Sequence, residues 1–236
     1  KPTKEPIIEE YGAEAIPNLS TLKTIFPKES IFPKSEKDWE LWDYHNFQKK
    51  ETFENAKVKQ GKNINEFIAN TQNYQANLIK VAAESFRRQK YKPVTGIFQF
   101  MFVESWKSVN WGIIDYLRNE KKGYDYLKTA YQPILPSVVS EKDIYKKNEL
   151  IKLQLWAIND LDKGFDSSSF SYILKDENNI IEKKSIIFNL KESSSTKIEV
   201  LSFDKLKPNN YELITQINSN DSVLLGKNRL KFKIMN

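Results

Sequence analysis

The pattern of hydrophobic residues changes near residue 136, and this change constrains the fold more than any other feature of the chain. Upstream, apolar residues recur at spacings of three and four, which is typical of helices, and short apolar runs separate these stretches. Downstream, apolar and polar residues alternate in short runs between turn residues, which is typical of strands. We therefore expect two domains, one of α/β type over residues 1–136 and one all-β over residues 137–236.

The clearest helix is expected over residues 63–90. Asn63 and Glu66 have the spacing of a capping box at its start, and Pro93 blocks its continuation. A second helix is expected over residues 120–132, because Pro133 stops it. The buried face of the first helix is expected to carry the residues at helical spacing: Ile64, Phe67, Ile68, Thr71, Tyr74, Gln75, Leu78, Val81, Ala82 and Phe86.

Two apolar runs in the same domain, over residues 6–9 and 95–103, predict strands. The second run is apolar enough for a strand covered on both faces, as in a parallel sheet between helices. The order of strand, helices, strand and helix is that of β/α units. Two units neither close a barrel nor make a self-sufficient sheet, so the chain is expected to be part of something longer. Alone, it would expose the apolar faces of residues 97–103.

Short runs of alternating residues after residue 136 predict the strands of the second domain. Turn residues such as those at 176–179 and 208–210 separate them. This spacing indicates an antiparallel β-sandwich of immunoglobulin type. The predicted strands cover residues 150–156, 170–174, 186–190, 197–201, 211–217 and 229–234.

The composition excludes several classes of site. The chain has no Cys and a single His, His45, so cysteine zinc sites, thiol nucleophiles and His-rich metal sites are excluded. We expect no metal and no cofactor. The net charge of +6 is spread over both halves, which argues against a nucleic-acid partner. No apolar run is long enough for a membrane span, and the sequence leaves the compartment open.

Carboxylates remain as the candidate catalytic groups. Glu9 and Glu10 end the first predicted strand, and Glu104 ends the second. Active sites of α/β barrels lie at the C-terminal ends of the strands, and neighbouring strand residues point to opposite sides. One of the two glutamates at 9 and 10 is therefore expected to face the barrel axis. Trp106 and Trp111 follow Glu104, and aromatic rings beside carboxylates are what a sugar site needs.

Residues 9–22 read E-E-Y-G-A-E-A-I-P-N-L-S-T-L. This segment resembles the S-E-[FY]-G-x-x-x-x-P-S-x-x-T-L segment of glycoside hydrolase family 2, closest to the β-mannosidase and exo-β-glucosaminidase branch. The resemblance implies the last β/α units of a (β/α)8 TIM barrel, strands seven and eight, followed by an immunoglobulin-like β-sandwich. Further segments resemble family stretches in the same order: 33–45, 67–88, 95–100, 106–116, 122–135 and 155–160.

Members of this family are retaining exo-glycosidases that use one glutamate as nucleophile and another as general acid/base. The position that matches the nucleophile is Glu10, which would attack the anomeric carbon of a carbohydrate substrate to form a glycosyl-enzyme. The family's acid/base belongs to a region upstream of Lys1. The chain alone is therefore expected to be inactive and to need the missing N-terminal part of the same enzyme as its partner.

Four further residues are expected at the substrate site. Trp106 is expected to form a wall of the sugar site, and Trp111 to be either a wall or a core residue. His45 matches a family position, as a sugar ligand or as a hydrogen-bonded structural residue. Glu104 stands where the family has aspartate, as a supporting or a subsite residue.

Other positions near these residues differ from the family or have supporting roles. Phe100, Lys107 and Asn110 depart from the family pattern and leave open which β-linked sugar, a β-mannoside or a related one, is bound. Glu14 is expected to be a solvated loop charge, and Asp115 to fix the loop that follows it. The alternative function is a non-catalytic carbohydrate-binding or assembly module derived from such an enzyme, which the departures at Phe100 and at position 104 favour.

Overall fold

The computed structural model describes residues 3–236 and divides the chain into two compact units. The first unit comprises the residues up to Phe86 together with Tyr91–Ala130, and the second comprises Arg87–Lys90 and Tyr131–Asn236. Residue 136, where the sequence places the domain boundary, lies within the first strand of the second unit, β3 (Ile134–Ser140).

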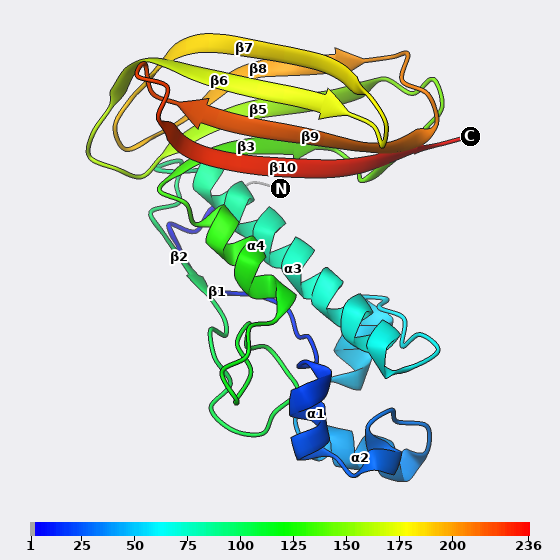
Figure 1. Ribbon diagram of the computed structural model, residues 1–236. Helices are drawn as coiled ribbons and strands as arrows, with labels where there is room; N and C mark the ends of the chain where they lie inside the picture. The colour runs from blue at the N-terminus through cyan, green and yellow to red at the C-terminus, as the bar shows by residue number, and fades with distance from the viewer. Residues whose placement is uncertain (1–2) are drawn as a thin grey trace. The chain divides into compact units, whose positions relative to one another are not determined.

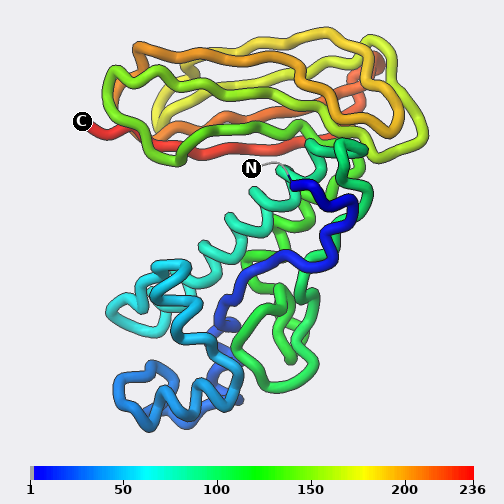
Figure 2. The backbone as a smooth tube through the Cα atoms, turned by 180° about the vertical axis from the view of Figure 1, so that it is seen from behind, coloured from blue at the N-terminus to red at the C-terminus, as the bar shows by residue number. Residues whose placement is uncertain are grey.

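Helices and one pair of parallel strands build the first unit. Strands β1 (Ile7–Tyr11) and β2 (Gly96–Gln99) pair in parallel and lie side by side in both views of the backbone (Figures 1 and 2). The order of strand, helices, strand and helix is that expected from the sequence. The helical elements are α1 (Leu19–Ile25), η1 (Lys28–Ser30), α2 (Glu36–Tyr44), η2 (Glu51–Asn55), α3 (Ile64–Arg88) and α4 (Lys122–Ala130).

Strand β2 is shorter and more exposed than the sequence predicts. It ends at Gln99, and the exposed fractions are 59% for Phe98, 39% for Phe100 and 52% for Phe102. The expectation of a strand covered on both faces is therefore wrong for the described residues. The physical reason is that this sheet has only two strands in residues 3–236, so these alternate side chains are covered only in part. The expected exposure of this apolar stretch is confirmed.

Helix α3 begins where the capping signal places it. The backbone N–H of Glu66 donates to the Asn63 side chain at 3.0 Å, and the Glu66 carboxylate accepts from the N–H of Lys62 at 2.8 Å. Gln75 is buried as predicted, Gln72 is buried on the same face without having been predicted there, and Val81 is 66% exposed. Placing Val81 on the buried face was wrong.

The second unit is a sandwich of two sheets, drawn as two layers in Figure 1. One sheet has the strand order β4-β10-β9-β6-β7 and the other the order β3-β5-β8. The strands pair antiparallel except β4 with β10, which run parallel. The strands after β3 are β4 (Ile144–Lys146), β5 (Ile151–Asn159), β6 (Phe165–Lys175), β7 (Ile180–Leu190), β8 (Ser194–Phe203), β9 (Asn209–Asn218) and β10 (Leu224–Met235).

All six strands predicted for this unit are confirmed, and β3 and β4 were not predicted. Strand β3 contains Pro136, which hides it in the sequence, but it lies at the edge of its sheet, where a missing N–H is tolerated. Alternate side chains of both sheets, such as Leu155, Phe170 and Leu213, are fully buried between the layers. The immunoglobulin type of this sandwich stays a prediction. In the described part of the chain, no helix has the length and apolar character to cross a membrane.

Candidate active site

Glu10, the predicted nucleophile, lies on an irregular stretch of β1. Ile8 pairs with Ile97 and Tyr11 with Gln99, so β1 has one residue more than β2 between these two pairs. Glu9 and Glu10 share this β-bulge, and both side chains are exposed. A bulge re-aims side chains and breaks strict alternation, so the pleat alone does not decide which glutamate faces a substrate.

Gly12 brings the segment after Glu10 against two aromatic residues. A Cβ atom at this position would lie 1.9 Å from the carbonyl oxygen of Phe100 and 3.4 Å from Cε3 of Trp111, so only glycine fits. The backbone N–H of Phe100 donates to the carbonyl of Tyr11 at 2.9 Å. The Phe100 and Trp111 rings meet edge to face, with centroids 5.9 Å apart. Phe100 and Trp111 thus pack together against the segment that directly follows the predicted nucleophile, Glu10.

Trp106 and His45 form a second aromatic group. The imidazole lies nearly parallel to the Trp106 ring with centroids 5.8 Å apart, and Tyr44 meets both rings edge to face. His45 is 8% exposed, and its Nδ1 lies 2.6 Å from the carbonyl oxygen of Lys107. Trp106 keeps 45% of its surface exposed and Tyr44 keeps 73%. His45 thus supports the exposed Trp106 ring from behind, and Tyr44 was not predicted to belong to this group.

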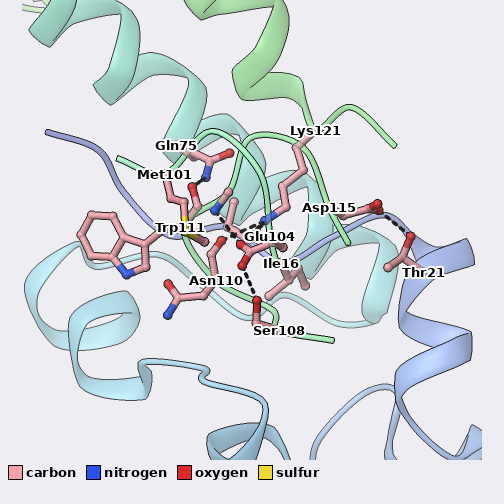
Figure 3. A network of polar contacts seen from close by, with 12 residues as sticks. Ile16, Thr21, Gln75, Met101, Glu104, Ser108, Asn110, Trp111, Asp115 and Lys121 are labelled. Carbon is pink, nitrogen blue, oxygen red and sulfur yellow. Dashed lines mark hydrogen bonds and ion pairs between the residues drawn. The ribbon is translucent and has the colours of Figure 1, made fainter. Parts of the chain in front are cut away.

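Glu104 lies inside the loop between β2 and α4 rather than on its surface. It is 1% exposed, and its carboxylate accepts hydrogen bonds from the Ser108 hydroxyl and, at 2.5 Å, from the N–H of Gly112. Lys121 Nζ lies 3.6 Å from Glu104 Oε1 (Figure 3). A Cβ atom on Gly112 would lie 2.8 Å from the Glu104 side chain. This placement favours the supporting role over the subsite role for Glu104.

Lys121 ties together the segments that surround the candidate site. Its ammonium group donates to the carbonyl oxygens of Ala15 at 2.5 Å and of Asn110 at 2.8 Å (Figure 3). Burial lowers the pKa of Lys121 to about 8, although the nearby carboxylates of Glu104 and Asp115 oppose this shift. Asp115 accepts from the Thr21 hydroxyl at 2.5 Å and from two backbone N–H groups in its own loop. Asp115 therefore fixes this loop, as expected.

Glu14 is buried, so the expectation of a solvated loop charge was wrong. Its side chain is 6% exposed, and Oε2 accepts from the backbone N–H of Gln48 at 3.1 Å. Oε1 has no hydrogen-bond partner among the described residues. Burial raises the pKa of Glu14 to about 8, with the charge of Glu51 acting in the same direction. Residues 13–17 are all buried together in the structure. The apolar residues on either side of Glu14 were the signal in the sequence that could have predicted this burial.

The carboxylates and the single histidine do not gather into a metal site. In residues 3–236, no three acidic or histidine side chains lie close enough together to hold a metal ion.

Replacing Lys121 by Met is expected to destabilise the first unit strongly. Glu104 would lose its buried counter-ion, and breaking one side of a buried ion pair costs about 3–5 kcal/mol. The neighbouring Lys122 is exposed, so Lys122→Met is the matched control and should change the free energy of unfolding by less than about 0.5 kcal/mol. Urea unfolding of both variants measures the difference. Equal stabilities of the two variants would contradict a central role for Lys121.

Glu14 is expected to make stability fall with rising pH. Its folded-state pKa of about 8 lies above the ordinary glutamate value of 4.5, so between these values the folded protein holds a proton that the unfolded chain has released. The stabilisation is complete below pH 4.5 and is lost as the pH rises through about 8. Glu14→Gln removes this group, so the stability difference between the two proteins should change across this window and stay constant below it. Parallel stability profiles from urea unfolding would count against the buried, protonated carboxyl.

Known proteins match this chain in sequence and in structure, although no family model matches it. Beta-mannosidase B of Aspergillus niger is 23% identical over 167 residues, which cover 65% of this chain and 19% of that protein. The beta-D-mannosidase of Dictyoglomus thermophilum superposes with a TM-score of 0.77 and 22% identity over 96% of this chain. The Amycolatopsis orientalis exo-chitosanase superposes with a TM-score of 0.72 and 16% identity, also over 96%.

The chain spans only part of each of these relatives, 27% of the length of both solved enzymes. Two independent comparisons, one of sequence and one of structure, thus lead to the same group of enzymes that the segment around Glu10 resembles. The resemblance is confirmed: this chain is similar in sequence and in fold to the C-terminal portion of glycoside hydrolase family 2 enzymes of the β-mannosidase and exo-β-glucosaminidase branch.

Proposed function

We propose that this chain is the C-terminal portion of a retaining exo-β-glycosidase and that Glu10 is its nucleophile. The observation that carries the proposal is the setting of Glu10. Its exposed carboxylate stands on a bulge, two residues before Gly12, which packs directly against Phe100 and Trp111. An exposed carboxylate that closely precedes a segment packed on aromatic rings suits a pyranose ring, which stacks its C–H groups on aromatic faces.

The reaction divides into two steps. In the first, a Glu10 oxygen bonds to the anomeric carbon from the α face while the bond to the leaving oxygen breaks, and a general acid protonates that oxygen. In the second, the same acid/base residue takes a proton from water, which attacks the anomeric carbon and releases Glu10. We assign this acid/base to a part of the enzyme outside the chain. Within residues 3–236, Glu14 and Glu104 are buried, and the oxygens of Glu104 are already bonded.

The proposed substrate is a terminal β-mannoside or a related β-linked sugar. Two of the three relatives described above are named as mannosidases and the third as an exo-chitosanase, and each is far longer than this chain. The upstream part of the same enzyme is the proposed partner that covers the exposed side chains of Phe98, Phe100 and Phe102. Burying three such aromatic rings would contribute several kcal/mol to that association. Trp106 and Trp111 are the proposed walls of the sugar site.

Chemical rescue tests the role of Glu10 in the longest natural form of the protein. Glu10→Ala should lower the rate on an activated aryl β-mannoside by orders of magnitude, because the nucleophile is gone. Sodium azide should restore turnover by entering from the vacated α face, and the product should be the α-mannosyl azide. Product configuration is read by NMR.

Glu9→Ala is the matched control, since Glu9 shares the bulge and is equally exposed. It should retain most of the activity and need no azide. If azide rescues Glu9→Ala instead, or if Glu10→Ala keeps the native rate, Glu10 is not the nucleophile.

A further inference from the structure

Three segments of the first unit hold the Trp111 side chain. Gly12 packs against its six-membered ring, and Phe100 meets it edge to face. The third contact is polar: the indole Nε1–H donates to the side-chain oxygen Oε1 of Gln48 at 3.3 Å. The two apolar contacts limit how far the ring moves sideways. The hydrogen bond fixes the rotation of the indole ring about the Cβ–Cγ bond that attaches it to the rest of the side chain.

Gln48 is itself held firmly enough to act as a fixed acceptor. Its backbone N–H donates to the buried carboxyl of Glu14 at 3.1 Å, and its carbonyl accepts from the N–H of Thr52 at 3.0 Å. The preceding residue, Phe47, is 2% exposed and packs in the aromatic core around Trp42. Both backbone polar groups of Gln48 are therefore paired, and its side chain starts from a rigid position.

The neighbouring Asn110 does not share this task. Figure 3 shows its amide pointing to the same side as the Trp111 ring, yet neither of its side-chain polar atoms has a partner among the described residues. The backbone carbonyl of Trp111 accepts from Gln75 Nε2 at 3.1 Å, which fixes the backbone but not the ring. Within the part of the chain that the structure describes, Gln48 is thus the side chain that orients the indole.

We propose that Gln48 is a positioning residue that fixes the Trp111 indole and thereby sets the affinity of the site for its sugar. The second half of this statement rests on the proposed function. A half-buried indole N–H without an acceptor would lose the net value of one hydrogen bond, and the ring would then sample other tilts. A sugar that stacks on the ring would have to restore the productive tilt on binding, which weakens its affinity.

Two readouts on the longest natural form of the protein test the proposal. The tryptophans, five of which lie in the present 236 residues, are labelled with 5-fluorotryptophan, and the Trp111 resonance is identified by its loss in Trp111→Phe. Gln48→Met keeps the side-chain length but removes the acceptor oxygen. It should move or broaden the Trp111 resonance only, raise KM for an aryl β-mannoside about three- to tenfold and leave kcat nearly unchanged. In the Trp111→Phe background, Gln48→Met should raise KM no further.

Two further variants serve as controls. Gln48→Glu keeps an acceptor oxygen at the same place and should restore most of the resonance position and of KM. Gln60→Met makes the same exchange at a half-buried glutamine that donates to the carbonyl of Pro33 and should change neither readout.

The outcomes separate this proposal from the proposed function. An unchanged Trp111 resonance in Gln48→Met overturns the positioning role, whether or not the protein is active. A shifted resonance with an unchanged KM overturns the link to sugar affinity. If the unsubstituted protein hydrolyses no β-glycoside, the proposed function fails and the link to sugar affinity fails with it, while the resonance still decides whether Gln48 fixes the indole.

Discussion

The buried ammonium group of Lys121 is the contact on which the candidate site depends. It reaches the carbonyls of Ala15 and Asn110 and faces the carboxylate of Glu104, so it joins the segment after β1 to the loop after β2. A lysine that is fully removed from water persists only where such partners compensate for its lost hydration. Glu10 precedes one of these segments and Trp111 belongs to the other, so this cation helps to hold together the two segments that carry the candidate site residues.

Two glycines also help to hold these segments in place, because they allow an approach closer than any larger residue would permit. Gly12 admits the carbonyl of Phe100, and Gly112 admits the side chain of Glu104, at separations that no Cβ atom would allow. Close backbone approach therefore adds to side-chain packing where the segment after β1 meets the loop after β2. The polar side chains of α3 act in the same way, since Gln75 donates to the carbonyls of both Ala13 and Trp111. The site is thus assembled mainly through backbone carbonyls, and the side chains of Glu10 and Trp106 stay exposed.

The sequence predicted where helices and strands lie better than it predicted which of their side chains are buried. Period and capping signals located α3 and the six long strands of the sandwich, because those signals are local. Strand β3 was missed because Pro136 reads as a boundary until its place at a sheet edge is known. The exposure of Val81 was not predicted, since it depends on which neighbours are present and not on the residue itself, whereas the exposure of Phe98 was expected once the chain was taken as part of a larger barrel.

For the site, the segments that resemble the family supplied the candidate residues, and the structure shows which of these candidates come together. His45 and Trp106 meet as one group, Trp111 joins Phe100, and Glu104 turns inward. Glu14, Gln48 and Tyr44 were not predicted as partners, because their contacts join segments far apart in the sequence. No periodicity or spacing encodes a hydrogen bond such as that between the Trp111 indole and Gln48.

The central claim is that Glu10 forms a covalent bond to a sugar, and trapping that bond tests it most directly. The longest natural form of the protein is incubated with a 2-deoxy-2-fluoro-β-mannoside carrying a good leaving group, and its intact mass and peptide masses are measured. The account predicts a single fluoromannosyl adduct on Glu10. An adduct on any other residue, or none while the enzyme hydrolyses the parent β-mannoside, would contradict it.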